Sequence, residues 1–302
     1  MNDSMQQQPP SSGRGIAGGA NKIEFRKARD FGAIVNDTFA FTRQNIRVLF
    51  KSLVFIVGPL MVVLAVLSGL YNVENFTRLA GKNAAENVFA GILTAKYGLI
   101  MLLSLASYTL TTLIACEYMV LYMDSPSGEV AFEDVWRDTK RDFFMLMFTS
   151  IGNFFVILFS IVLLIVPGIY FMVVLTLVPI IRVRERIGYF ASLGRSMKLL
   201  SGNWWFTFGV LLIMGIIVLS MGWILGVPSG AVAFLAMFHK ADAASPLYQF
   251  LFMASGLINQ FYSFLSVLVL VATALQYFSL IEKKEGLGLL QKIEDVRKDD
   301  GA

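Results

Sequence analysis

Cysteine, histidine and charged residues are all scarce in this chain of 302 residues, and each scarcity excludes a class of protein. The single cysteine, Cys116, excludes an intramolecular disulfide, and the single histidine, His239, excludes a histidine-rich metal site. Charged residues make up 15% of the chain, against about a quarter in an average soluble domain. Hydrophobic residues make up 56%, which is more than a soluble core of this size can shield from water. The composition therefore predicts an integral membrane protein.

The sequence also lacks the short motifs that usually carry catalysis. It contains no phosphate-binding glycine-rich loop, no metal-binding motif and no nucleophile elbow. We therefore expect a protein that is not an enzyme and that holds no catalytic residues, cofactor or metal. The first residues are rich in Gln, Pro, Ser and Gly without an apolar run, which predicts a disordered cytoplasmic tail over 1–25 rather than a signal peptide.

Long apolar runs, in contrast, are abundant. A membrane-spanning helix needs about 20 mostly apolar residues, and we predict about six such helices. They cover 51–71, 97–123, 143–166, 169–181, 204–227 and 250–281. The fourth is short by itself and follows Pro167-Gly168, a pair that predicts a tight turn.

The predicted fold class is therefore all-α: a polytopic membrane helix bundle over 26–285, with about six transmembrane helices and three amphipathic interfacial helices. One further apolar run, 229–238, is too short to span a bilayer, and we interpret it as a re-entrant or surface helix. A charged cytoplasmic tail is expected over 286–302.

The distribution of Lys and Arg predicts the orientation of these helices. Four of the 25 basic residues fall on one side of a six-span chain: Arg78, Lys82, Lys96 and Lys240. The other 21 fall on the opposite side, together with both chain ends. Because cytoplasmic loops carry the excess of Lys and Arg, we expect a multi-pass protein of the bacterial cytoplasmic (inner) membrane with both termini in the cytoplasm. The net charge of +4 does not indicate a nucleic-acid partner, since the basic residues lie beside apolar runs.

Three segments on the predicted cytoplasmic side have the spacing of amphipathic helices: 31–49, 132–143 and 187–200. Each leads into a predicted span, so we interpret them as interfacial helices whose basic residues contact anionic headgroups. The candidate headgroup-binding residues are Arg43, Arg47, Arg137, Lys140, Arg195 and Lys198. The pattern fits three copies of an interfacial helix followed by two spans, and it also fits ordinary basic juxtamembrane segments, so both interpretations stay open.

The stretch 167–212 contains a Pro-Gly turn, a short span, a loop and a helix that leads into the next span. Its signature residues are Ala191, Arg195, Ser196, Leu199, Asn203, Trp204 and Trp205. It resembles a bacterial family of six-helix membrane proteins of unknown function, similar to the YciC-like proteins and to the membrane domain attached to some glycerophosphodiester phosphodiesterases. Three residues separate Ala191 from Arg195, where the family pattern has two. The resemblance implies a six-helix membrane domain and supplies no catalytic residues.

Few polar side chains fall inside the predicted spans. The candidates for an intramembrane polar site are Glu117, Asn153, Asn259 and Gln260. A buried acid in a membrane helix is costly and often functional, so Glu117 could carry protons; alternatively, it could reach the lipid headgroups or pair with Arg182 or Arg184. The three amides could line a polar path or form hydrogen bonds between helices.

These observations favour a non-enzymatic membrane module that organises lipids or partner proteins at the cytoplasmic membrane. The expected partners are membrane lipids with anionic headgroups, and a membrane protein partner is also open. A transporter or lipid translocator is the alternative, which the in-span polar residues and the prolines Pro59 and Pro179 would serve. The lack of paired intramembrane charges argues against ion-coupled transport.

Overall fold

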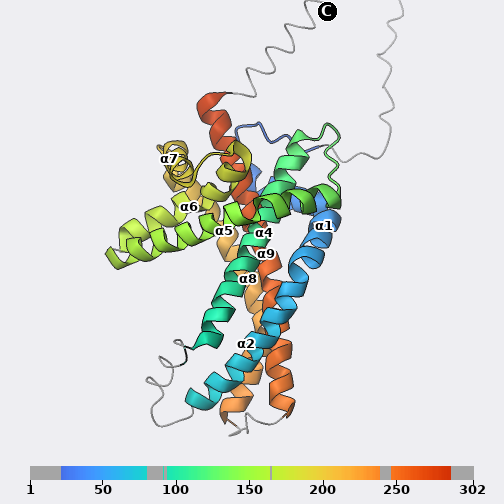
Figure 1. Ribbon diagram of the computed structural model, residues 1–302. Coiled ribbons are helices and arrows are strands. Elements are labelled where there is room, and N and C mark those ends of the chain that lie inside the picture. Colours follow the sequence, from blue (N-terminus) through green and yellow to red (C-terminus); the bar gives the residue numbers. More distant parts are fainter. Residues whose placement is uncertain (1–21, 80–90, 92–93, 164, 239–245, 287–302) are drawn as a thin grey trace, which may run out of the picture.

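The computed structural model describes residues 22–79, 91, 94–163, 165–238 and 246–286, and every regular element in these ranges is helical (Figure 1). The elements are α1 Phe31–Ser52, the π-helix η1 Leu53–Val57, α2 Gly58–Leu79, α4 Ala95–Asp124, α5 Phe132–Leu163, α6 Ile165–Glu185, α7 Tyr189–Leu200, α8 Trp204–Phe238 and α9 Pro246–Glu285. Within the described residues, six helical stretches are long and apolar enough to cross a membrane. The predicted fold class, an all-α polytopic bundle, is confirmed.

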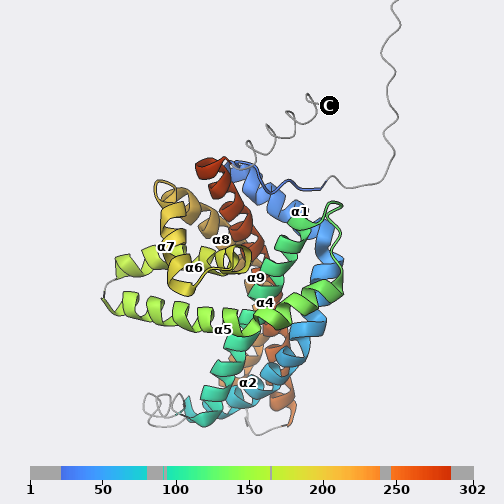
Figure 2. The ribbon, with the colours of Figure 1, turned by 45° about the horizontal axis from the view of Figure 1, so that its top comes forward.

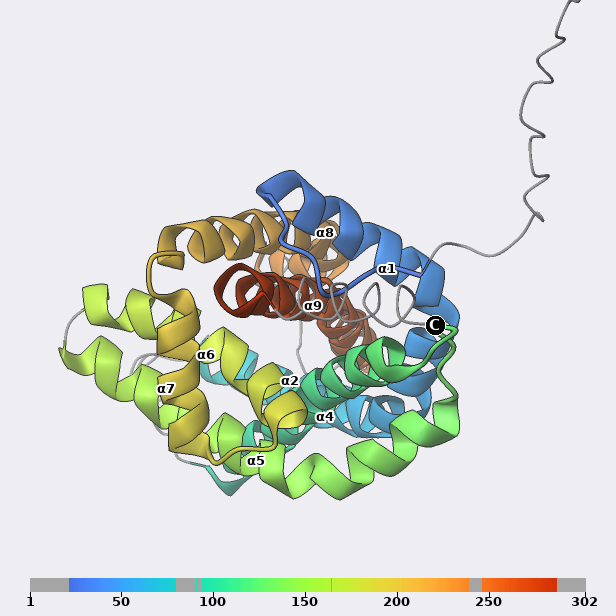
Figure 3. The same ribbon diagram turned by 90° about the horizontal axis from the view of Figure 1, so that it is seen from above.

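Two sets of helices run in different directions. Helices α2, α4, α8 and α9 run along the long axis of the bundle (Figure 1). Helices α5 and α6 form a hairpin that lies across one end of this bundle and projects to the side (Figures 1, 2 and 3). We call this end, which also holds α7 and the last turns of α9, the upper end. The segment 22–30 lies there too, so both described chain ends are at the upper end, whereas α2 ends and α4 begins at the opposite, lower end.

Inner and outer helices alternate along the chain. In the most apolar stretch of each candidate span, 50, 50 and 67% of the residues are buried for α4, α6 and α9. The corresponding share is 33% for Phe31–Tyr71 and 22% for each of the stretches in α5 and α8. Each amphipathic segment is thus followed by an outer helix and then by an inner helix, which is the order that a threefold repeat requires.

Two predicted boundaries are wrong because helices continue through them. The first interfacial segment and the first span form one helical run through α1, η1 and α2, and the second segment and its span are the single helix α5. The π-helix ends at Val57, and α2 begins with Gly58 and Pro59, the second of which has no N–H to donate to the preceding turn. The third segment does form a separate helix, α7, with Gly188 and Ser201 at its two ends.

The interpretation of 229–238 as a re-entrant or surface helix is also wrong, since these residues continue α8 as far as Phe238. The sequence of α8 contains no Asp, Glu, Lys or Arg, so no charged residue interrupts the apolar helix before Phe238. The prediction of a turn at Pro167-Gly168 is wrong, because both residues belong to α6, which begins at Ile165. Pro167 therefore stands in the first turn of α6, where its missing N–H costs no hydrogen bond.

The segment 22–30 crosses the upper ends of the inner helices. The side chain of Phe25 is buried there among three aromatic rings. The ring centroids of Phe41, Tyr122 and Phe278 lie 5.6, 5.5 and 5.3 Å from that of Phe25. The predicted tail 1–25 lies outside the described residues as far as position 21, and its last residues pack on the bundle.

Arg29 fixes this segment in place and is one of the largest fully buried side chains in the described structure. Its Nε donates to Asp37 on α1 at 2.7 Å, and its Nη1 donates to the carbonyl of Phe25 at 2.9 Å. Its backbone N–H donates to the hydroxyl of Ser279 on α9, also at 2.9 Å. Because a buried guanidinium without partners would cost several kcal/mol, these contacts hold the segment in one position.

Candidate functional site

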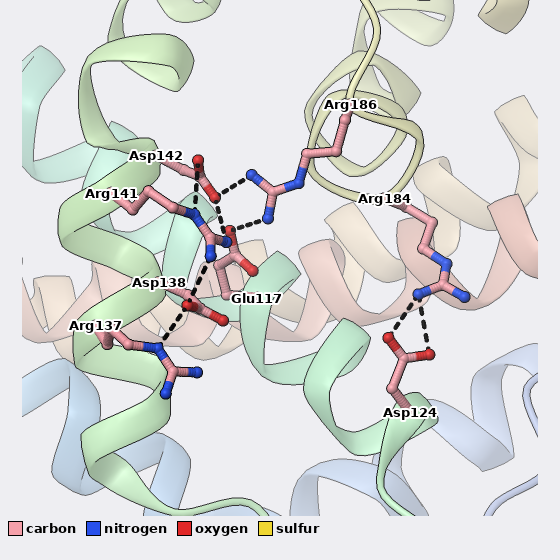
Figure 4. A network of polar contacts seen from close by, with 8 residues as sticks. All are labelled: Glu117, Asp124, Arg137, Asp138, Arg141, Asp142, Arg184 and Arg186. Carbon is pink, nitrogen blue, oxygen red and sulfur yellow. Dashed lines mark hydrogen bonds and ion pairs between the residues drawn. The ribbon is translucent and has the colours of Figure 1, made fainter.

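Glu117 lies on the inner helix α4, about two turns before the helix ends at Asp124. Its side chain is 1% exposed, so the carboxyl group is shielded from both water and lipid. Its Oε1 atom has no hydrogen-bond partner among the described residues, and it forms an ion pair with Nη2 of Arg186 at 3.7 Å (Figure 4). Arg186 is the cation that contacts this buried carboxyl group, and its guanidinium group also contacts Asp142.

Arg186 reaches Glu117 through an unusual backbone conformation. It follows the last residue of α6 with a φ of 55°, and its N–H donates to the carbonyl of Arg182 at 3.1 Å. This left-handed conformation often ends helices, but it favours glycine and costs other residues about 1 kcal/mol or more. The guanidinium group also forms an ion pair with Asp142 on α5, and these two contacts offset the backbone strain.

Charges of alternating sign continue from Asp142 along α5. Arg141 lies 3.0 Å from Asp142 and 3.1 Å from Asp138, and Arg137 also lies 3.1 Å from Asp138. The two aspartate side chains are 8% exposed, whereas those of Arg137 and Arg141 are 64 and 52% exposed. Buried acids therefore lie beneath a layer of half-exposed guanidinium groups (Figure 4).

Arg184 takes part in a separate ion pair at the end of α4. Its Nη1 lies 3.0 and 2.7 Å from the two carboxylate oxygens of Asp124 (Figure 4). The alternative in which Glu117 pairs with Arg182 or Arg184 is therefore wrong in its partner, which is Arg186. Helical spacing along α6 does not point to residue 186, because the helix has already ended there.

The in-span amides do not join this charge network. Asn153 on α5 accepts a hydrogen bond at 3.1 Å from the hydroxyl group of Tyr189, the first residue of α7. Burial raises the pKa of Tyr189, an effect that Arg182 partly opposes, so the phenol keeps the proton that it donates. Asn259 and Gln260 belong to α9, and their side chains lie outside what the structure describes.

The predicted headgroup-binding residues divide into two groups. Arg137 and Arg195 are neutralised by acids: Arg195 lies 3.1 Å from Glu185 and 2.6 Å from Glu285. The other four are exposed and have no ion pair within the described ranges: Arg43, Arg47, Lys140 and Lys198. The Lys140 ammonium lies 4.8 Å from the ring centroid of Trp136, where a cation remains free to meet an anion.

Sequence reasoning missed the residues that hold the upper end together. Asp142 lies three residues after Thr139 and seven after Val135, in the row of the predicted apolar face, but it was not singled out as an acid that would be buried. Arg186 was one of several basic residues in a predicted loop. No sequence pattern indicated that Arg29 would be buried. Their partners lie far away along the chain, so only the packing of the helices reveals them.

The chemistry that this arrangement supports is charge compensation between helices. Glu117 on α4 and Asp142 on α5 share the guanidinium group of Arg186, so one side chain joins two helices to the loop that leads into α7. Within the described ranges, no group of three His, Cys, Asp or Glu side chains is placed to hold a metal ion. The site therefore links α4, α5 and the loop before α7 at the upper end of the bundle.

Comparisons with protein-family models, with curated proteins and with solved structures found no match to this chain. The resemblance of 167–212 to the YciC-like family therefore remains a prediction from the residues of that stretch.

Proposed function

We propose that the protein is a non-enzymatic module of the bacterial inner membrane that gathers anionic lipids around the upper end of its bundle. The observation that carries the proposal is a rim of three helical segments around this end: α1, the start of α5, and α7 (Figure 3). Each segment carries an exposed cation with no ion pair in the described residues, namely Arg47, Lys140 and Lys198. Separate cations around a rim suit the many headgroups that surround a membrane protein better than they suit one small ligand.

The outward side of α7 supports a position at the membrane interface. The buried residues of this helix are Ser192, Ser196, Leu199 and Leu200. Ser196 donates from its hydroxyl group to the carbonyl of Val174 on α6 at 2.6 Å, whereas Phe190 is 82% exposed. A helix that presents a large apolar side chain outward fits an acyl boundary better than it fits water.

We also propose that the upper end faces the cytoplasm. The structure has both described chain ends at this end and the start of α4, with Lys96, at the other. The excess of Lys and Arg in the segments at the upper end gives the orientation expected from the positive-inside rule. In this orientation the rim meets the leaflet that carries the larger negative surface potential.

A transport function receives less support from these contacts. A polar path needs its in-span groups to face one another, but Glu117 contacts Arg186 and Asn153 contacts Tyr189. Both groups are occupied by contacts that join helices, which is the role that packing assigns to polar residues in membranes.

Lipid retention tests the proposed function. The protein is purified in nanodiscs that contain phosphatidylcholine with a minor share of phosphatidylglycerol, and mass spectrometry measures the lipids recovered with it. We expect enrichment of the anionic lipid, and a loss of that enrichment in the triple variant Arg47→Gln, Lys140→Gln, Lys198→Gln. High salt is expected to reduce the enrichment as well, because exposed charges are screened.

Lys96→Gln is a control for the loss of a cation elsewhere, because it removes an exposed lysine at the lower end that is paired with Glu74 at 2.8 Å. Equal enrichment in the wild-type protein and in the triple variant would refute the proposal. So would a protein partner that purifies at a fixed ratio and accounts for the enriched lipid, since the module would then act by recruiting that partner.

A further inference from the structure

An apolar groove of about 620 Å³ runs along the outside of the bundle, between α1 and the helices α8 and α9. Its lining includes Phe39, Arg43, Ile46, Phe50, Phe264 and Leu268. A second hollow of about 450 Å³ continues it towards the lower end and shares Phe264. The volume lies within the roughly 300–1,000 Å³ that is typical of ligand pockets.

The path of the first helical run explains why the groove exists. At Gly256, a Cβ atom would lie 2.9 Å from the backbone carbonyl oxygen of Ala65, so α2 and α9 touch through their backbones at this level. Towards the upper end from this contact, the π turn of η1 and Pro59 interrupt the regular helix. Kinks at such positions are a usual cause of a change in helix direction, and the second hollow is lined by Gly58 and Pro59. The separation of the two helices therefore has a cause in the sequence.

The groove carries one charge, at Arg43. This side chain is exposed, and no acid within the described residues pairs with it. The hydroxyl group of Thr42, the other polar lining residue, already donates to the carbonyl of Thr38 at 2.8 Å. Among the residues that line the groove, Arg43 is thus the polar side chain without a partner in the described residues.

The length of the groove fits one leaflet of a bilayer. At about 1.5 Å per helical residue, the distance along the helix from Arg43 to Val54 is about 16 Å, and half of the hydrocarbon core is about 15 Å. A ligand with its anionic group at Arg43 would therefore have its apolar part end near η1.

We propose that this groove binds one anionic phospholipid, with its phosphate at Arg43 and an acyl chain between α1 and α9. The inference rests on the proposed function and deepens it, because it separates one fixed lipid from the loosely gathered lipids of the rim. The charge decides the occupant: an apolar helix of a second protein would leave the Arg43 guanidinium without an anion, whereas a phosphate group pairs with it.

Progressive removal of lipid tests the groove. Protein from the same nanodiscs is transferred to detergent and stripped stepwise, and native mass spectrometry counts the lipids that remain on each chain. The expected end state is one phosphatidylglycerol per chain. Ile46→Trp, which fills the groove, is expected to lower retention of this last lipid about tenfold, the effect of losing roughly 1.4 kcal/mol.

Leu212→Trp is the matched control, because Leu212 is an exposed apolar residue of α8 outside the groove. It should retain the lipid as the wild-type protein does. Arg43→Gln, an exposed substitution that leaves the packing intact, should still retain one lipid but lose the preference for phosphatidylglycerol over phosphatidylcholine. Equal retention in Ile46→Trp and Leu212→Trp, an unchanged preference in Arg43→Gln, or a protein in place of the lipid would each overturn the proposal.

The two proposals fail in different ways. Ile46→Trp keeps Arg47, Lys140 and Lys198, so the total enrichment of anionic lipid in nanodiscs stays if the rim attracts it. The triple rim variant keeps the groove and Arg43, so the last lipid stays if the groove binds it. Enrichment that persists in the triple variant therefore counts against the rim alone, and a last lipid that persists in Ile46→Trp counts against the groove alone.

Discussion

The ring of Tyr189 lies directly on Gly152, where an added Cβ atom would be 2.8 Å from Cζ of the ring. This contact joins the transverse helix α5 to the start of α7, and the hydroxyl group of the same tyrosine donates to Asn153. The position of α7 on the bundle therefore depends on the absence of one side chain.

Gly152→Ala is expected to destabilise the protein by about 1–3 kcal/mol, because overpacking at this contact moves the ring of Tyr189. Gly194→Ala is the control, since Gly194 lies on α7 itself and an added Cβ atom there meets no neighbour within 4 Å. Thermal unfolding in detergent measures both variants. Equal melting temperatures would contradict the importance of the contact between Tyr189 and Gly152.

Arg186→Gln removes the cation that Glu117 and Asp142 share. We expect a loss of about 1–3 kcal/mol, less than for a fully buried pair because the Arg186 side chain is 43% exposed. The double variant Arg186→Gln, Glu117→Gln should recover much of the loss, since no uncompensated acid remains on α4. Denaturation of the single and double variants measures the coupling, and a double variant as unstable as Arg186→Gln would argue against a charge-compensated Glu117.

Phe25→Ala removes a buried aromatic ring from the segment that crosses the inner helices. The expected cost is about 3–5 kcal/mol, as for other buried phenylalanines. Phe190→Ala serves as the comparison, because this residue has the same side chain and is 82% exposed. If both variants melt at the same temperature, the segment 22–30 contributes little to the fold.

Cysteine labelling tests the direction of the transverse hairpin. The native Cys116 is buried, so single cysteines at Lys96, Ser127 and Val166 can be read separately. A membrane-impermeant thiol reagent should label Lys96→Cys from one side of the membrane and Ser127→Cys from the other. Val166→Cys, near the turn between α5 and α6, should not be labelled from the Lys96 side, because the hairpin stays at the upper end. Labelling of Lys96→Cys and Val166→Cys from the same side would mean that α5 crosses the membrane.

The apolar runs of the sequence predict helices well where a run is long and bounded by charge. The stretch 97–123 corresponds to α4, and 250–281 lies within α9. Where boundaries depend on more than composition, prediction fails: residues 31–49 join the span that follows, and 229–238 extends α8. Hydropathy gives the length of a helix but not its direction, so it does not distinguish the axial α4 from the transverse α5.

The site shows the same division between local and long-range information. Glu117 is recognisable in the sequence as an acid inside an apolar run, because its cost in a membrane is a local property. Its partner Arg186 is set by the end of α6 and by the packing of three helices, neither of which leaves a periodic pattern. The separation of free cations such as Arg43 from neutralised ones such as Arg137 likewise depends on which acids the fold brings near.

The hairpin of α5 and α6 has a consequence for the shape of the surrounding bilayer. Its exposed side chains, including Phe144, Phe148 and Phe159, need an apolar environment, yet the hairpin lies across one end of the bundle. If the labelling experiment places the hairpin at one face of the membrane, it displaces acyl chains from one monolayer, whereas the axial helices displace them from both. A membrane whose two monolayers differ in area bends, and the monolayer with the hairpin takes the convex side. Such a molecule is expected to accumulate where a membrane is already curved in that sense, so that geometry as well as lipid composition decides where it resides.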